Sequence, residues 1–259
     1  MSTTHFDWPL ISVITVVFNG EKHIRSTIES VFIQDFKNYE LLVVDGASTD
    51  RTIEIVSEYK NQISAVVSER DKGIYDAMNK GIKLAKGEWL FFLNCQDTFL
   101  NSTVLSQVAN DLVDLKKYNV YCGSVAAMVN ERQALQYPLP FQGQLNARNL
   151  FKSHFCHQAL FVRRSAYIQH GYFKAIYKTF ADFEVIYSII REQGGFKKSN
   201  VCIARFDLDG VSSNWRHSVK LFLEAEEIFK SFGERRSYLS FKIAHIRAYL
   251  YKARKMMFG

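Results

Sequence analysis

Residues 10–18 read L-I-S-V-I-T-V-V-F, and Asn19-Gly20 follows them directly. An almost unbroken run of β-branched and aromatic residues is typical of a parallel strand that is buried on both faces. The Asn-Gly pair then marks a turn, and residues 22–34 place four apolar side chains at helical spacing. This opening predicts a strand, a turn and a helix, with the strand inside a covered sheet.

The same alternation of strand and helix continues through the first hundred residues. Further strands are expected at 40–44, 64–68 and 88–93, and helices at about 50–59 and 74–85. Strands that alternate with helices through short connections predict an α/β fold, with a doubly wound, mostly parallel sheet and helices on both faces. Such a sheet binds its ligand at the carboxyl ends of its strands.

The pattern is looser in the second part of the sequence. The expected elements are helices at about 102–116 and 182–193, and strands near 120–129, 159–162 and 200–206. No internal repeat is visible. We predict one domain over residues 1–215, followed by a helical tail over residues 216–259.

The composition indicates a folded protein of a reducing compartment. Of the 259 residues, 47% are apolar and 23% are charged, as is usual for a globular chain. The four cysteines are far apart and form no C-x-x-C pair, which argues against a disulfide framework and a zinc site. The N-terminal residues lack the pattern of a signal peptide, and no apolar run reaches the roughly 20 residues that span a bilayer. We therefore expect a cytoplasmic protein.

The formal net charge of +7 is concentrated near the C-terminus. Residues 214–259 contain ten Lys or Arg and four Asp or Glu, so +6 of this charge lies there. A basic tail indicates a local surface contact, whereas binding of nucleic acid would favour a basic body. Six apolar residues of the tail share one helical stripe: Leu239, Ile243, Ile246, Leu250, Ala253 and Met257. Two alternatives stay open: peripheral attachment to the anionic inner face of the cell membrane, or packing on the protein itself or a second subunit.

Polar residues stand where the first two strands end. Asn19 follows the strand at 10–18 and Asp45 follows the strand at 40–44, without the G-x-G-x-x-G turn of a dinucleotide site. A carboxylate in this place can accept hydrogen bonds from a base N–H or a ribose hydroxyl. The alternative is structural, with Asp45-Gly46 as a simple turn and Asp50 as a helix cap.

A denser group of ionisable residues lies in S-E-R-D-K-G-I-Y-D-A-M-N-K-G at residues 68–81. Asp71 and Lys72 crowd the loop at the end of a strand, and Asn79 follows in the second turn of the next helix. So many charges in one loop are costly unless they bind a ligand. The preference of acids for a helix N-terminus explains Asp76 but not the whole loop.

Three motifs in this order carry a resemblance: T-V-V-F-N-G at 15–20, V-V-D-G-A-S-T-D at 43–50, and the segment from S-E-R-D-K-G to G-E-W at 68–89. They resemble the donor-binding half of family 2 glycosyltransferases with the GT-A fold, in the branch found in bacterial surface-polysaccharide gene sets. The resemblance covers about residues 10–215 and implies a donor half, about 10–100, and an acceptor half, about 101–215. It implies donor-binding roles for Val16, Phe18, Asn19, Asp45, Asp71, Lys72, Asn79 and Gln96.

The fourth strand ends in L-N-C-Q-D at residues 93–97, where the family usually has an acidic pair and a divalent cation. A hard cation offsets the charge that develops on a departing nucleoside diphosphate. Here Gln96 takes the place of the first acid. The resemblance therefore implies that Asp97 binds Mn²⁺ or Mg²⁺, with a weakened metal dependence, and that Gln96 is a neutral hydrogen-bonding partner of the ribose.

F-A-D-F-E at residues 180–184 resembles the acceptor-side motif of the family. An inverting transfer needs a carboxylate that takes the proton of the acceptor hydroxyl. The resemblance gives this role to Asp182, with Glu184 as the alternative base and a helix N-cap as the structural alternative. His157-Gln158 resembles a pair that the family carries near the donor phosphates or the acceptor, and a structural role for this histidine stays open.

These features predict an inverting, metal-assisted glycosyltransferase of hexosyl or N-acetylhexosaminyl type. Its donor would be a nucleotide sugar, by the resemblance a UDP-sugar, and its acceptor a hydroxyl of a glycan or lipid-linked molecule in bacterial surface-polysaccharide synthesis. The alternative is a catalytically silent subunit that binds nucleotide sugar and serves as a scaffold in a glycosyltransferase complex. A sugar nucleotidyltransferase shares the layout, but residues 10–22 lack the glycine-rich basic loop that it needs.

Overall fold

The structure is a computed structural model, and it describes residues 8–113, 115–129, 132–137, 156–193, 196–207, 215–234, 238–239 and 242–243. The strands are β1 (Ile11–Val17), β2 (Tyr39–Asp45), β3 (Ala65–Ser68), β4 (Trp89–Phe92), β5 (Thr98–Phe99), β6 (Val120–Val129), β7 (Arg132–Tyr137), β8 (Leu160–Arg163) and β9 (Lys197–Asp207). The helices are α1 (Ile24–Phe32), α2 (Thr52–Glu58), α3 (Ile74–Leu84), α4 (Val104–Leu112), α6 (Arg164–Gln169), α7 (Ala181–Gln193) and α8 (Trp215–Ser231), with a 3-10 turn η1 (His157–Ala159).

One mixed sheet joins these strands in the order β3-β2-β1-β4-β8-β6-β9-β5, with β7 paired to β6. The strands from β1 to β4 are parallel, because the intervening segments return the chain to the same edge. β8 then runs antiparallel to both β4 and β6, and β6 runs parallel to β9. The predicted α/β sheet is confirmed. Its strands are parallel from β3 to β4, and the first antiparallel strand is β8.

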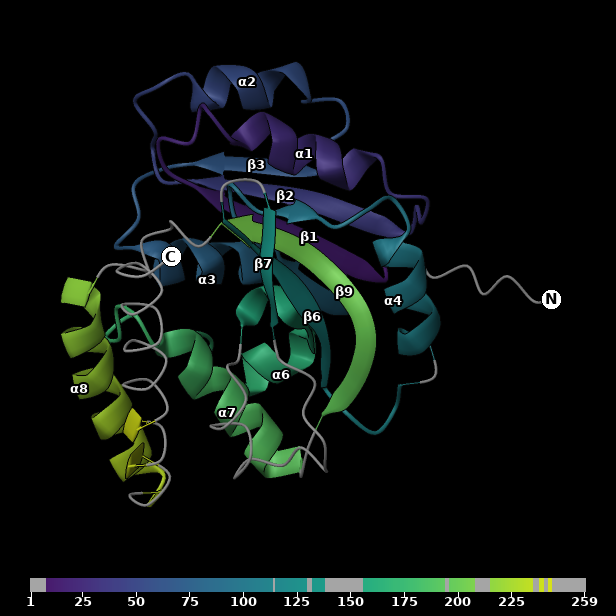
Figure 1. The fold of residues 1–259 in the computed structure, drawn as a ribbon. Helices are drawn as coiled ribbons and strands as arrows, with labels where there is room; N and C mark the ends of the chain where they lie inside the picture. Colours follow the sequence, from purple (N-terminus) through teal and green to yellow (C-terminus); the bar gives the residue numbers. More distant parts are fainter. Residues whose placement is uncertain are drawn as a thin grey trace.

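Alternate residues of the strands feed two apolar layers, one on each face of the sheet. Ile14 and Leu42 belong to the layer under α3, α6 and α7, while Val13 and Leu41 belong to the layer under α1, α2 and α4. Figure 1 shows α1 and α2 on one side of the sheet and α3, α6 and α7 on the other. Burial on both faces explains the continuous apolar runs of β1 and β2.

Helix α8 packs on the side of the sheet that α7 covers. Its residues Ala225, Ile228 and Phe229 are buried, and the ring of Phe229 stacks on that of Phe183 in α7, with centroids 5.7 Å apart. This part of the predicted tail therefore packs on the protein itself. Leu239 and Ile243 are exposed, and the rest of the predicted apolar stripe, from residue 246 onward, lies outside the described residues.

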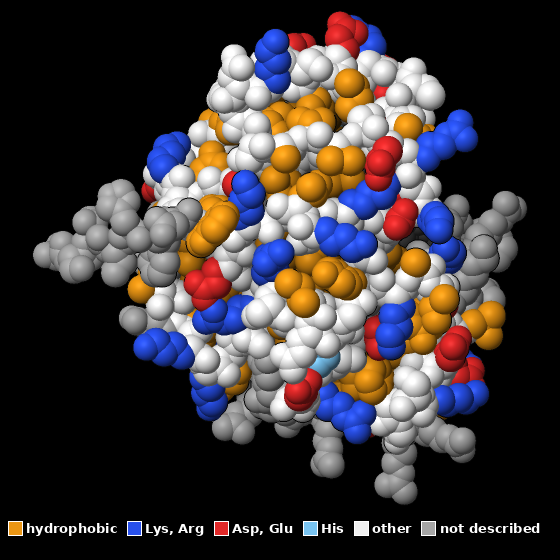
Figure 2. All heavy atoms as spheres, turned by 180° about the vertical axis from the view of Figure 1, so that it is seen from behind, with side chains coloured by type: hydrophobic (Ala, Val, Ile, Leu, Met, Phe, Trp, Pro, Cys, Tyr) orange, Lys and Arg blue, Asp and Glu red, His pale blue; other side chains and the backbone are white. Residues whose placement is uncertain are grey.

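The surface carries both signs of charge. On the face that Figure 2 shows, Lys and Arg side chains are interspersed with Asp, Glu and apolar side chains. Within the ranges that the structure describes, no helix is long and apolar enough to cross a membrane.

The amino ends of β1, β2 and β4 are held together by a buried carboxylate. Glu40 accepts hydrogen bonds from the hydroxyl of Ser12 and from the backbone N–H groups of Lys86 and Gly87, at 2.6 Å and 3.1 Å for the two N–H groups. Gly87 also donates to Ser12 Oγ at 2.8 Å. A Cβ atom on Gly87 would lie 2.6 Å from the backbone nitrogen of Ser12, so this position has no room for a side chain.

We predict that Gly87→Ala lowers the free energy of unfolding by about 1 to 3 kcal/mol, because the added methyl group must displace the β1 backbone. Urea unfolding of the variant and the wild type measures this loss. Lys86→Ala, at the adjacent exposed position, is the control and should change stability by less than about 0.5 kcal/mol. Equal stability of the two variants would contradict the close contact.

Candidate active site

The carboxyl ends of the first strands meet at one edge of the sheet. Val17 is paired with Asp45, and Asp45 with Ser68, so β1, β2 and β3 end at the same level. The chain after β4 continues along β1, since the N–H of Cys95 donates to the carbonyl of Val16 at 3.2 Å. Four loops, after β1, β2, β3 and β4, therefore gather at this edge, which is where the sequence predicts a ligand.

The loops after β1 and β2 are fastened to each other. The backbone N–H of Asn19 donates to Ser48 Oγ at 2.8 Å, and Asn19 Oδ1 accepts from the N–H of Thr49 at 2.9 Å. The N–H of Gly20 donates to Thr52 Oγ1 at 2.8 Å. The side-chain oxygen of Asn19 thus holds the two loops together, and its predicted contact with a donor stays a prediction.

Asp45 lies below these loops and has 0% exposure. Its carboxylate accepts from the N–H and the hydroxyl of Ser48, and from Ser68 Oγ at 2.6 Å. Val16 is also buried, at 6% exposure, and its carbonyl is taken by Cys95. Val16 and Asp45, both predicted to bind the donor, therefore form the floor of the site. A ligand would contact the loop that Asp45 holds, which lies above the Asp45 side chain.

Phe18 and Asp71 form the rim above this floor. The ring of Phe18 is 64% exposed at the end of β1. A Cβ atom on Gly46 would lie 2.5 Å from Asp71 Oδ2 and 3.4 Å from the Phe18 ring, so the glycine allows both side chains to approach the loop. Asp71 Oδ1 accepts from the N–H of Gly73 at 2.9 Å. An exposed aromatic ring beside an oriented carboxylate suits a nucleobase.

The helix after this rim is tied to the second half of the sequence. Asn79 donates to the carbonyl of Phe173 at 2.8 Å and accepts from the N–H of Phe173 at 2.9 Å. Both ends of the amide thus bind the backbone of Phe173, and the donor role of Asn79 stays a prediction. Lys72 is exposed in the loop that begins α3, and the ammonium group of Lys80 pairs with Glu69 at 2.9 Å.

The turn after β4 places Asp97 beside a residue from the second half of the sequence. Gln96 has a φ of +93°, and its N–H donates to Thr27 Oγ1 at 3.1 Å, which fixes the turn on α1. The carboxylate of Asp97 is buried at 6% exposure and accepts from Gln158 Nε2 at 3.3 Å. Two predicted residues from opposite halves of the sequence are thereby in contact.

His157 forms the second connection between the halves, which we call the His157 bridge. Asn94 Nδ2 lies 3.0 Å from His157 Nε2, and His157 Nδ1 lies 3.2 Å from Asp182 Oδ2. Because the amide of Asn94 donates, Nε2 must accept, and the ring proton sits on Nδ1, where it is donated to Asp182. The other oxygen of Asp182 accepts from the Tyr75 hydroxyl at 3.0 Å and from the N–H of Phe183 at 2.8 Å.

These contacts set the charge of Asp182. Burial alone would raise its pKa, but His157, the N–H of Phe183 and the hydroxyl of Tyr75 hold the pKa of Asp182 below its usual value. Its side chain remains 20% exposed. Asp182 is therefore an ionised carboxylate at neutral pH, with access to a molecule bound at this edge.

Glu184, the alternative base, is placed differently. Its side chain is 5% exposed and forms an ion pair with Lys174 at 2.7 Å. Two residues along a helix face different directions, so Glu184 does not join the Tyr75 and His157 contacts. The geometry favours Asp182.

Two thiols also lie at the site. Cys95 Sγ faces the carbonyl of Gly20 at 3.7 Å, and burial raises the pKa of this thiol to about 12. The thiol of Cys156 donates to Gln158 Oε1 at 2.6 Å, and burial raises its pKa well above the ordinary value. Both are hydrogen-bonded structural groups.

Asp97 is the carboxylate that the sequence predicts as the metal ligand. Among the described residues, no group of three or more His, Cys, Asp or Glu side chains has the geometry of a metal site. Asp97 alone fits a Mg²⁺ or Mn²⁺ ion that takes its remaining ligands from phosphate oxygens and water, as such ions commonly do. Of the predicted residues, Asp97, Gln158, His157 and Asp182 are connected, and Phe18 lies with Asp71.

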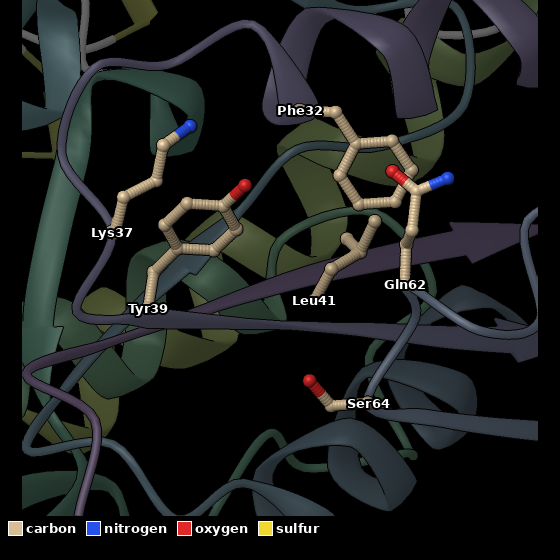
Figure 3. Close-up of a pocket in the computed structure, with 6 residues that line it drawn as sticks. All are labelled: Phe32, Lys37, Tyr39, Leu41, Gln62 and Ser64. Carbon is tan, nitrogen blue, oxygen red and sulfur yellow. The ribbon is translucent and has the colours of Figure 1, made fainter.

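A separate hollow lies at the opposite edge of the sheet. Figure 3 shows its six lining residues, Phe32, Lys37, Tyr39, Leu41, Gln62 and Ser64. Tyr39 begins β2, so the hollow is at the amino ends of the strands, and the hydroxyl of Tyr39 is taken by the carbonyl of Val31 at 3.1 Å. It lacks carboxylates and is not part of the candidate site.

Comparisons with known proteins agree with this layout. The family described as "Glycosyl transferase family 2" matches residues 12–171. A PGL/p-HBAD biosynthesis glycosyltransferase of Mycobacterium bovis is 31% identical over 180 residues, which are 68% of this chain and 68% of that protein. An Escherichia coli UDP-Glc:alpha-D-GlcNAc-diphosphoundecaprenol beta-1,3-glucosyltransferase is 32% identical over 100 residues, 38% of this chain and 40% of that protein.

Solved structures share the fold. Residues 1–349 of S. aureus TarS, in complex with UDP, superpose with a TM-score of 0.67 at 21% identity, over 84% of this chain and 64% of that one. The mannosyltransferase PcManGT of Pyrobaculum calidifontis, in complex with GDP-Man and Mn²⁺, has a TM-score of 0.66 at 17% identity, over 97% of this chain and 76% of that one.

Tyr75→Phe should raise the pKa of Asp182, because the carboxylate loses a hydroxyl donor. A depressed folded-state pKa stabilises the protein above the unfolded value of Asp, and this contribution is lost as the pH falls through the folded-state pKa. The variant should therefore be less stable at pH 7, by about 1 to 2 kcal/mol, and the difference should shrink in acid.

Carboxyl-carbon NMR of Asp182 measures its pKa, and urea unfolding at pH 7 and in acid measures the loss of stability. Tyr121→Phe is the control, because it removes a hydroxyl that donates to a different carboxylate, Asp111, at 2.9 Å. An Asp182 pKa that responds equally to both substitutions would contradict the assigned contact.

Proposed function

Because the chain belongs to the family 2 glycosyltransferases, we propose that this site transfers a sugar from a UDP-sugar to a hydroxyl of a glycan or lipid-linked acceptor, with inversion at the anomeric carbon. The observation that carries the proposal is the His157 bridge, which joins Asp182 to the carboxyl end of β4. The sugar is of hexosyl or N-acetylhexosaminyl type, and the product belongs to bacterial surface-polysaccharide synthesis.

The donor half would hold the nucleotide. The base stacks on Phe18, whose ring is exposed at the rim, and donates an N–H to Asp71. Lys72 approaches the diphosphate, and Gln96 hydrogen-bonds the ribose.

Asp182 would act as the base. As the acceptor oxygen bonds to the anomeric carbon, its proton passes to the carboxylate of Asp182, and the bond from that carbon to the diphosphate oxygen breaks with both electrons staying on the diphosphate. His157 and Tyr75 hold the carboxylate in place for this transfer. A divalent cation bound at Asp97, when present, would offset the charge of the departing diphosphate.

The C-terminal segment supports a peripheral site of action. Residues 214–259 carry most of the net positive charge, and Leu239 and Ile243 are exposed. We propose that this segment attaches the enzyme to the anionic cytoplasmic face of the membrane. The relative from E. coli is named for a diphosphoundecaprenol acceptor, and an acceptor of that kind would lie at such a surface.

Thermal unfolding with a panel of nucleotide sugars, with and without Mn²⁺, tests the donor assignment. A UDP-sugar should raise the melting temperature by mass action, and Mn²⁺ should add to the effect. In Asp97→Ala the contribution of Mn²⁺ should disappear while the nucleotide contribution remains. Failure of every nucleotide sugar to stabilise the protein would rule out the proposed donor class.

The catalytically silent scaffold remains the second candidate, and Gln96 in the place of an acid is the feature that favours it. An enzyme should hydrolyse its donor slowly with Mn²⁺ and lose this activity in Asp97→Ala. A scaffold should bind the donor and leave it intact.

Asp182→Asn should lower the turnover number for transfer by at least about 100-fold, because the amide cannot take the acceptor proton. Its affinity for the donor should stay within about twofold of wild type. Steady-state transfer and donor titration give the two values. Glu192→Gln, on the exposed end of α7, is the matched control, and an Asp182→Asn variant as active as that control would refute the base assignment.

A further inference from the structure

The carboxylate of Glu224, on α8, receives four hydrogen bonds from the turn that begins α7. Oε1 accepts from the N–H of Lys178 at 2.7 Å. Oε2 accepts from the N–H of Thr179 at 2.9 Å, from Thr179 Oγ1 at 2.9 Å and from the N–H of Phe180 at 3.1 Å. No other single carboxylate among the hydrogen bonds of the described residues gathers three consecutive backbone N–H groups.

Such a contact has a known physical role at a helix start. The first N–H groups of a helix have no partner within the helix, and a negative charge is favourable at that end. A side chain next to the helix in sequence usually supplies the partner. Here Glu224 binds the N–H groups of Lys178, Thr179 and Phe180, which directly precede the first helical residue, Ala181. Glu224 therefore fixes the turn that leads into α7, from 45 residues away in sequence.

The helix that follows this turn carries Asp182 in its first turn. The segment directly after α8 also holds α7 further along, since the hydroxyl of Tyr187 donates to Glu234 at 3.2 Å and the guanidinium of Arg191 donates to the carbonyl of Phe232 at 3.1 Å. The direction of Asp182 toward Tyr75 and His157 depends on where α7 begins, and Glu224 holds the residues directly before that beginning.

We propose that Glu224 is a positioning residue for the transfer reaction: through the start of α7 it holds the carboxylate of Asp182 against Tyr75 and His157. The proposal rests on the function proposed above for Asp182. It gives α8, which lies beyond the family match at residues 12–171, a part in the active site without contact to either substrate.

Glu224→Ala tests the proposal in the full-length protein. The turnover number should fall between about 10- and 100-fold, as for a small misplacement of a reacting group, while the KM for the donor changes less than about twofold. The pKa of Asp182 should rise, because a loosened first turn weakens the contacts from Phe183 and Tyr75. Amide hydrogen exchange at residues 179–183 should become faster.

Glu226→Ala is the matched control on the same helix. Glu226 pairs with Lys230 at 2.7 Å, one turn further along α8, so its loss should leave turnover and the Asp182 pKa unchanged. Glu224→Gln keeps one acceptor oxygen and should recover part of the lost turnover, and it replaces Glu224→Ala as the test if the alanine variant does not fold.

The proposal is overturned if a folded Glu224 variant keeps wild-type turnover, or if the Asp182 pKa and the exchange at residues 179–183 match those of Glu226→Ala. These last two readouts need no substrate. A fully active Asp182→Asn variant would refute the proposed base, whereas an undisturbed Asp182 in Glu224→Ala would refute the positioning role alone.

Discussion

His157 can keep its place only while groups from two distant parts of the chain hold its ring. Asn94, after β4, donates to one nitrogen, and Asp182, in α7, accepts from the other. Because an imidazole with one proton offers one donor and one acceptor, this pairing fixes both the tautomer and the direction of the Asp182 carboxylate. The sheet supplies the first partner and the second half of the chain supplies the other, so the site exists only when both halves have folded.

The sequence could predict the first half of the fold because β1 and β2 are buried on both faces, which leaves an apolar run with no competing interpretation. It could also predict that Asp97, Gln158, His157 and Asp182 belong together, although only through the family resemblance. It could not predict that the amides of Asn19 and Asn79 bind the protein's own backbone. A polar side chain near a strand end looks the same in the sequence whether it binds a ligand or the protein's own backbone. The backbone partner is distant in sequence and is seen only in the structure.

Tyr75, a partner of Asp182, and Asn94, a partner of His157, were missed for the same reason. Tyr75 and Asn94 lie inside motifs that the sequence analysis quoted, but a tyrosine in an amphipathic helix resembles a core residue, and 107 positions separate it from Asp182. The C-terminal part of the chain shows the same limit of sequence-based prediction. Its basic and apolar spacing left two alternatives open, attachment to a membrane and packing on the protein itself. Phe229 and its neighbours in α8 are buried against α7, since a helix with one apolar side gains most by covering another helix.

The two thiols of the site have a practical consequence. Cys95 and Cys156 are protonated at neutral pH, because burial disfavours the thiolate, and a protonated thiol is a poor nucleophile. Alkylating reagents and mild oxidants should therefore leave this edge of the sheet unmodified. Electrophilic compounds aimed at these two cysteines would be an unproductive starting point for inhibitors, and maleimide chemistry would not attach a reporter dye at this site.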